Sequence, residues 1–173
     1  QTLANPGDMS IIGNSTPRYS FGFRTSVGWK GFDLDIFMQG VGKRDQWINT
    51  TYFLTQYTNE WGGIAEASMD YWSPQNPDAY FPRPLISGSG DIVAVQSRFL
   101  QNAAYIRLKQ LTFSYTIPST LTKKAGIERV KLFFSGANLW TGTKMTKISD
   151  PELAGPNSYP LYKSLSLGAN IDL

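Results

Sequence analysis

The amino-acid sequence offers few side chains that could catalyse a reaction. It contains no histidine and no cysteine, which removes the commonest general base, the thiol nucleophile and two frequent metal ligands. Catalysis by carboxylates alone, as in a glycoside hydrolase, needs two acids roughly 5–10 Å apart. Asp70, Asp78 and Asp150 lie in irregular segments, and nothing in their spacing pairs them. We therefore expect no enzyme, no cofactor and no metal site.

Aromatic side chains offer a different chemistry, because their rings can stack on sugars or pack against a partner protein. They crowd the long irregular stretch 41–98. Four of them are candidate contacts for a ligand or a partner: Trp47, Tyr52, Trp61 and Trp72. A structural role is the alternative, since an ordered loop of this length needs a core of its own. The proline-rich segment 70–77 is expected to be structural, because its prolines fix a rigid course.

Composition limits the classes of protein to which the chain can belong. A length of 173 residues fits one domain. Aromatic residues make up 14% and charged residues 17%, where about 25% charged is usual for a soluble domain, so the surface is not expected to face only water. The net charge of +3 is small and dispersed, which argues against a nucleic-acid partner. No apolar run reaches the roughly 18 residues of a transmembrane helix.

The start of the sequence reads as a loop rather than as a targeting segment. It has no basic region followed by an apolar run, so no signal peptide is predicted, and its first residue is not methionine. We expect the chain to be cut from something longer or to begin at a processed end.

Apolar and polar residues alternate along several stretches, as they do in a strand with one apolar and one wet face. The pattern is clearest at the end of the chain, where Leu165, Leu167 and Ile171 share one face. Five strands are predicted, at about 18–29, 32–40, 99–116, 129–138 and 161–173, separated in part by long loops at 41–98 and 139–160.

Local signals predict how these strands are joined. Lys30-Gly31 is typical of a two-residue hairpin turn, in which glycine supplies a positive φ. Segment 118–128 predicts one turn of helix that ends at Gly126. The apolar phase changes near Lys109-Gln110, and a β-bulge at that point would restore a single apolar face.

The predicted polar face carries charges and two aromatic exceptions. Arg24, Asp33 and Asp35 face each other across the first hairpin in the predicted register, and we expect a charge network rather than a substrate site. Phe37 and Phe133 are out of phase, because they fall among the polar residues.

The lengths of the connections favour a membrane β-barrel. They alternate between short and long, so in an antiparallel sheet both short turns lie at one end and both long loops at the other, as in outer-membrane barrels. A soluble β-sandwich that binds carbohydrate explains the alternation of side chains equally well and stays open as the alternative. Five strands cannot close a barrel, since the smallest need about eight. The chain must therefore oligomerise or form a piece of a larger barrel.

Several motifs resemble one known family. They are IIGNSTPRYSFG at Ile11–Gly22, KGFDLDIFMQGVGKRD at Lys30–Asp45, DYWSPQNPDAYFPRP at Asp70–Pro84, RFLQNAAYIRLK at Arg98–Lys109 and SGANLW at Ser135–Trp140. In this order they resemble the C-terminal region of the SusC-like TonB-dependent outer-membrane transporters of Bacteroidetes. One departure is the final Leu173, where such barrels commonly end in phenylalanine.

The resemblance implies an all-β fold and a function. This stretch would be the last five strands of an antiparallel transmembrane barrel of about 22 strands, with long extracellular loops and short periplasmic turns. The whole protein would import glycans or oligopeptides across the outer membrane of a Gram-negative bacterium. Its partners would be a SusD-like surface lipoprotein, against which the loop aromatics could pack, TonB, outer-membrane lipid, and the plug and remaining strands of the same barrel.

Overall fold

The computed structural model describes residues 7, 9–48, 57–58, 64, 66–86, 94–147, 149–153, 159 and 161–172. The chain divides into two compact units. The first, which we call the loop unit, comprises Gln1–Thr16, Arg44–Ala103 and Met145–Tyr159. The second, the sheet unit, comprises Pro17–Lys43, Ala104–Lys144 and Pro160–Leu173.

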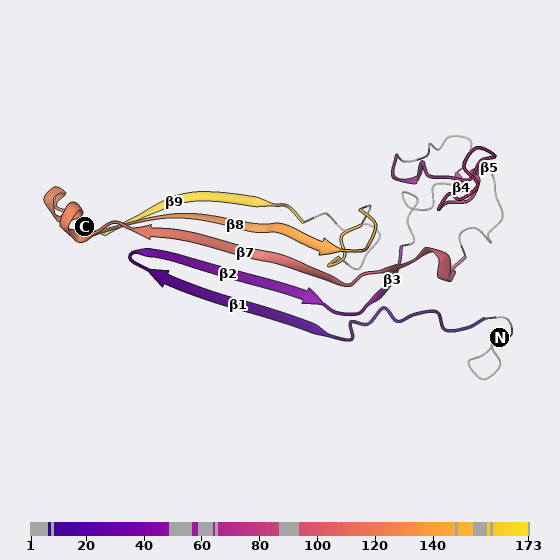
Figure 1. Ribbon diagram of the computed structural model, residues 1–173, viewed down its shortest axis with the longest axis horizontal. Coiled ribbons are helices and arrows are strands. Elements are labelled where there is room, and N and C mark those ends of the chain that lie inside the picture. Colours follow the sequence, from indigo (N-terminus) through magenta and orange to yellow (C-terminus); the bar gives the residue numbers. More distant parts are fainter. Residues whose placement is uncertain are drawn as a thin grey trace. The chain divides into compact units, whose positions relative to one another are not determined.

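The sheet unit is a five-stranded antiparallel sheet in which strands that follow one another in this unit are neighbours (Figure 1). Its strands are β1 (Ser20–Trp29), β2 (Phe32–Val41), β7 (Tyr105–Thr116), β8 (Arg129–Thr143) and β9 (Ser164–Asp172). The predicted all-β, antiparallel fold class is confirmed. Several boundaries differ from the expected ones by a few residues; for example, β8 runs to Thr143 rather than to Asn138, and β9 begins at Ser164 rather than at residue 161.

The turn of the first hairpin is formed by the two predicted residues, Lys30 and Gly31. Both have a positive φ, 49° at Lys30 and 88° at Gly31, which is the geometry of the tight turns whose twist matches that of paired strands. A Cβ at Gly31 would lie 2.9 Å from the carbonyl oxygen of Thr116, so glycine is required for space as well as for φ.

The second short connection contains the predicted helical turn. Helix α1 (Ser119–Thr122) continues into the 3₁₀ helix η4 (Lys123–Ala125), and the chain leaves at Gly126 with φ 74°. The left-handed glycine ends the helix as expected. In the described part of the chain, no helix has the length and apolar character needed to cross a membrane.

A β-bulge on β7 keeps the two faces of the sheet in phase. Leu108 pairs with Met38 and Gln110 with Phe37, so Lys109 is the extra residue, as predicted. On the other side Leu108 pairs with Trp140 and Gln110 with Ala137, which leaves two residues of β8 opposite Lys109. One of them, Asn138, has φ 53°, a conformation that asparagine adopts more readily than most residues.

The register divides the sheet into one apolar face and one polar face. The apolar face carries Phe23, Trp29, Phe32 and Leu167, among others, and these side chains are exposed: Leu167 by 84% and Trp29 by 66%. An exposed apolar surface that extends over five strands is far larger than single exposed residues would give, and it marks a surface that contacts something other than water.

The two aromatic exceptions lie over glycines of neighbouring strands. A Cβ at Gly22 would lie 3.5 Å from the Phe37 ring, and a Cβ at Gly168 would overlap the ring of Phe133. An aromatic ring that covers a cross-strand glycine replaces the packing that the glycine lacks. Phe37 and Phe133 therefore cover the backbone of the polar face.

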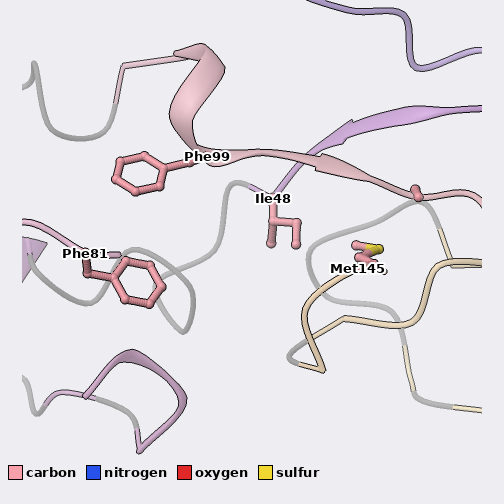
Figure 2. Packing of buried hydrophobic residues seen from close by; sticks show 5 residues of the cluster. Ile48, Phe81, Phe99 and Met145 are labelled. Atoms are coloured by element: carbon pink, nitrogen blue, oxygen red, sulfur yellow. The ribbon is translucent and has the colours of Figure 1, made fainter. Parts of the chain in front are cut away.

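The loop unit has secondary structure and a hydrophobic core of its own. Strand β3 (Asp45–Trp47) pairs antiparallel with β6 (Leu100–Asn102), and β4 (Tyr57–Thr58) pairs in parallel with β5 (Leu85–Ile86). Short 3₁₀ helices lie at Glu66–Ser68 and Ser97–Phe99. Figure 2 shows the core, in which Ile48, Phe81, Phe99 and Met145 converge with buried Ala103.

This arrangement corrects one predicted strand. Residues 99–116 were expected to form a single strand, but 100–102 pair with β3 in the loop unit and only 105–116 enter the large sheet. The break falls at Ala103, which is fully buried in the core and donates its N–H to the carbonyl of Arg44 at 2.8 Å. The Ala103 N–H is thus bonded within the loop unit, and pairing with the large sheet begins two residues later, at Tyr105.

Candidate functional site

The polar face of the sheet carries a first charge cluster around Asp35. Its Oδ2 accepts hydrogen bonds from the Ser26 hydroxyl at 2.6 Å and from Arg24 Nη2 at 3.3 Å. Arg24 and Ser26 lie on β1, and Asp35 lies on β2. The contact between Arg24 and Asp35 is therefore the one predicted across the first hairpin.

Asp33 does not join that cluster, which corrects the predicted three-residue network. It lies opposite Gly28, which has no side chain to offer, and it turns to the next strands instead. Its Oδ2 lies 2.8 Å from Lys131 Nζ on β8 and 3.4 Å from the Ser114 hydroxyl on β7. Lys131 could not be predicted as the partner of Asp33, because 98 residues separate the two in the chain and strand β7 lies between their strands in the sheet.

A third pair, Arg129 with Asp172 at 2.6 Å, joins β8 to β9. We call these three pairs the ionic band: Arg24–Asp35, Asp33–Lys131 and Arg129–Asp172. All three are substantially exposed, and exposed pairs contribute only about 0–1 kcal/mol each. The band therefore leaves a hydrated face whose paired charges compensate one another, rather than a site that holds a ligand by unpaired charge.

In the loop unit, Asp70 closes a turn. Its Oδ2 accepts the backbone N–H of Tyr80 at 3.1 Å and its Oδ1 accepts the Asn76 amide at 3.0 Å. The Tyr80 N–H first, and the Asn76 side chain second, lower the pKa of the Asp70 carboxyl below its ordinary value, against a smaller opposing effect of burial. Both oxygens are thus used for structure, in keeping with a rigid course for this proline-rich segment.

Asp150, another of the candidate acids, also accepts a backbone hydrogen bond. Asp150 Oδ1 accepts the backbone N–H of Glu152 at 2.9 Å, which is a local turn contact. Among the described residues, no group of three or more acids could hold a metal ion.

Arg98 stabilises the same turn by hydrogen bonds to its backbone. Its Nη2 donates to the carbonyl of Ala79 at 2.8 Å and its Nε to the carbonyl of Tyr80 at 3.1 Å. The Tyr80 ring packs edge-on against Phe99, and its hydroxyl accepts a hydrogen bond from Gln101 at 2.9 Å. Two sequence motifs, Asp70–Pro84 and Arg98–Lys109, therefore meet as a single packed structure.

A second pair of motifs meets through Arg44 and Asp45. The backbone N–H of Asn14 donates to Asp45 Oδ2 at 3.0 Å, and Arg44 Nε donates to the carbonyl of Ser15 at 3.1 Å. Arg44 also donates to the carbonyl of Pro151 at 3.4 Å. One guanidinium thus joins three segments of the loop unit.

The predicted aromatic contacts fall into three groups. Trp47 lies in β3 and packs, half-buried, against the core cluster. Trp72 is 41% exposed, and its backbone N–H donates to the carbonyl of Phe81 at 2.9 Å. Tyr52 and Trp61 lie outside the described residues. The structure therefore leaves Trp72 as the described member of the set whose ring is available to a ligand or a partner.

Sequence reasoning did not single out the residues that hold the loop unit together. Arg44 and Arg98 act on backbone carbonyls, which leave no mark in the sequence, and the segments they join are distant along the chain. Arg44 lies within the motif Lys30–Asp45 and Arg98 within the motif Arg98–Lys109, and this position in the motifs is the signal in the sequence that could have pointed to them.

Comparison with known sequences points to one class of protein. No family model matches the chain. "TonB-dependent receptor P3" of Formosa agariphila is 30% identical over 180 residues, covering 95% of this chain and 17% of the relative. "TonB-dependent receptor P26" of the same organism is 26% identical over 190 residues, covering 98% of this chain and 18% of the relative.

Comparison with solved structures agrees. The RagAB peptide transporter superposes with a TM-score of 0.72 at 25% identity, over 93% of this chain and 18% of that one. The RagAB peptide importer in its "open-open" state gives 0.69 at 26% identity, over 94% and 18%. This chain therefore spans less than a fifth of the length of these proteins, whose names describe receptors and transporters rather than enzymes.

Proposed function

Because this chain is a SusC-like relative of the TonB-dependent receptors and part of an outer-membrane β-barrel, we propose that it forms the last part of the wall of an active importer. The observation that carries the proposal is the two-faced sheet. Its apolar face is exposed over all five strands, which suits contact with lipid, and its polar face suits a hydrated lumen.

The edges of the sheet support a larger barrel. Among the described residues, β1 pairs only with β2 and β9 only with β8, so each has one edge without a strand. A membrane sheet must pair its edges, because lipid offers no hydrogen bonds to the backbone. The missing strands belong to the rest of the protein, in a closed barrel of about 22 strands that also holds the plug and the TonB-contacting region.

The proposed cargo is an oligomeric nutrient, a peptide or a glycan, captured together with a SusD-like surface lipoprotein. The two-part name of the RagAB peptide importer supports both a partner and a peptide. The exposed ring of Trp72 is a proposed contact for cargo or partner, and Tyr52 and Trp61 are proposed with it. Trp47 belongs to the same proposal, with a smaller contact surface because it packs on the core.

A soluble β-sandwich that binds carbohydrate is less well supported. A sandwich buries the apolar face of one sheet against a second sheet. In the described residues the other two sheets have two strands each and lie in the loop unit, and the apolar face of the large sheet stays exposed.

Uptake by cells that carry the full-length receptor tests the proposal. We expect deletion of its gene to abolish uptake of one class of labelled oligomer, peptide or glycan, and a copy of the gene to restore it. Dissipation of the proton gradient should stop uptake without preventing surface binding. Unchanged uptake of both classes in the deletion strain, or uptake that survives loss of the gradient, would overturn the importer.

The barrel itself is tested separately by gel migration. The full-length protein in detergent should migrate as a compact form before boiling and as an extended chain afterwards. A protein that stays soluble and monomeric without detergent would contradict the membrane barrel.

A further inference from the structure

A hollow of about 760 Å³ lies at the end of the sheet where the short connections turn. Its lining, all of it in the sheet unit, includes Thr116, Ser119, Lys123, Glu128, Arg129 and Asp172. Thr116 pairs with Lys131, and Arg129 pairs with Asp172, so the lining residues that stand on strands belong to the polar face. The hollow therefore lies on the side of the sheet that we assign to the lumen, at the short-turn end.

Two charges in this hollow are uncompensated among the residues that the structure describes. Lys123 and Glu128 are exposed, and neither makes an ion pair with a described residue. The hydroxyl-bearing side chains of Thr116 and Ser119 line the same hollow. The hollow thus offers one ammonium, one carboxylate and two hydroxyls to whatever occupies it.

The other charges of the lining are already engaged. Arg129 is neutralised by Asp172, with 2.6 Å between the guanidinium and the carboxylate. Lys30 also lines the hollow, but its Nζ lies 5.0 Å from the centre of the Trp29 ring, which belongs to the apolar face. The lining is therefore mixed in charge rather than basic, and it does not suit a small anion.

The wall of the barrel does not account for the whole length of the relatives. The 180 residues matched in TonB-dependent receptor P3 are 17% of that protein, which therefore has about 1,000 residues. This chain uses 173 residues for a sheet of five strands. At that length per strand, about 22 strands would take up about three quarters of such a protein, and barrels of this width have a plugged lumen. The remaining quarter is long enough to form the plug.

We propose that this hollow is a docking site for the plug of the same polypeptide. A polar loop of the plug places an acidic side chain against Lys123 and a basic side chain against Glu128, and its backbone bonds to the hydroxyls of Thr116 and Ser119. Ion pairs inside a filled lumen are screened less by salt than pairs on an open surface, so they hold the loop in place. The inference deepens the proposed importer and rests on the barrel wall proposed there.

Zero-length cross-linking of the full-length receptor in outer membranes tests the docking site. A carbodiimide joins a lysine amine directly to a carboxylate that it touches, and mass spectrometry identifies the joined residues. We expect Lys123 to be joined to an acidic residue of the plug, and Glu128 to a lysine of the plug. Cross-links from Lys123 to residues of the barrel wall alone would overturn the proposal.

Lys124 is the matched control for this experiment. It is an exposed neighbour of Lys123 that does not line the hollow, so it should give no cross-link to the plug. Equal cross-linking of Lys123 and Lys124 to the plug would show a general attraction between charges and would also overturn the docking site.

Charge reversal measures how firmly the loop is held. Lys123→Glu should quicken amide hydrogen exchange in the cross-linked plug loop roughly tenfold, because an attraction becomes a repulsion. Lys124→Glu should leave this exchange unchanged. Changing the cross-linked acid of the plug to lysine in the Lys123→Glu protein should restore slow exchange, since the pair is then present with its charges exchanged. Fast exchange that persists after the exchange of charges would contradict a direct pair.

This outcome is separable from that of the importer. Cross-linking and exchange are measured on folded receptor whose compact gel form is intact, and neither depends on uptake. A receptor that imports its cargo but gives no cross-link between Lys123 and the plug refutes the docking site alone. A receptor that stays soluble without detergent refutes the barrel and its lumen.

Discussion

Arg98 stabilises the turn at residues 70–81 by donating to two carbonyls and by packing its guanidinium 5.8 Å from the centre of the Phe99 ring. We expect Arg98→Ala to cost about 2 kcal/mol of local stability, because hydrogen bonds from charged groups are among the stronger ones. The exchange of the Phe81 amide hydrogen, which is bonded to the carbonyl of Asp70, should quicken roughly 30-fold.

The matched control for this change is Arg83→Ala. Arg83 is exposed in the same motif, and the removal of its side chain should leave exchange at Phe81 unchanged. Equal acceleration in both variants would mean that charge, and not the contacts of Arg98, protects the turn.

Asp70 gives the same turn a dependence on pH. Its pKa is lowered in the folded protein from an ordinary value of 3.8, so the carboxylate contributes stability that is fully present above pH 3.8 and is lost as pH falls through the folded value. Protection of the Tyr80 amide should therefore decrease in acid below that pH. In Asp70→Asn this step should be absent, and a step that persists in the variant would assign it to another group.

At the scale of single residues, the sequence predicted which side chains lie on the polar face better than it predicted which of these side chains pair with one another. The salt bridge of Arg24 with Asp35 follows from the register of a hairpin with a two-residue turn, which sequence patterns specify. The bond between Asp33 and Lys131 depends on how two later strands align, and no local signal carries that information.

Among the elements, β2 shows how closely the strands of the sheet approach. A Cβ at Gly40 would overlap the ring of Phe21 and lie 2.5 Å from the carbonyl oxygen of Tyr105. At Gly22 the nearest atom would be 3.5 Å away, which is an ordinary contact. We expect Gly40→Ala to destabilise the barrel by about 1–3 kcal/mol through overpacking, and Gly22→Ala to be nearly neutral.

Unfolding of the full-length protein in urea, followed by loss of the compact gel form, would measure both variants. A lower midpoint for Gly40→Ala and an unchanged one for Gly22→Ala are expected. Equal midpoints would mean that β1 and β7 move apart at little cost.

The strands of the large sheet could be predicted because their alternation, their turn residues and the bulge at Lys109 are all local signals. The elements of the loop unit could not. Its core joins Ile48, Phe99 and Met145, which are far apart in the sequence, and strands as short as β3 and β6 carry too few residues for a period to show.

For the molecule as a whole, the two faces of the sheet predict opposite responses to charge. Leu167 lies near the middle of β9 on the apolar face and is 84% exposed, whereas its neighbour Ser166 points to the polar face. Leu167→Arg should reduce assembly in the outer membrane, because an arginine facing the bilayer centre costs about 2–4 kcal/mol. Ser166→Arg should be tolerated in a hydrated lumen.

The amount of compact receptor in outer-membrane fractions distinguishes these outcomes. An exposed leucine in a water-soluble sheet would accept arginine without loss. Normal levels of the Leu167→Arg protein would therefore contradict a lipid-facing sheet, whatever the fate of the Ser166→Arg protein.

The core of the loop unit has a consequence for the order in which the protein is assembled. Met145 follows β8 in the chain, whereas the other members of this core, Ile48, Phe81, Phe99 and Ala103, all precede β7. Until β8 has been threaded into place, Ile48, Phe81 and Phe99 lack the side chain that closes over them. We therefore expect the loop unit to be completed only after β8 has formed, and a chain halted before β8 to leave these apolar side chains exposed.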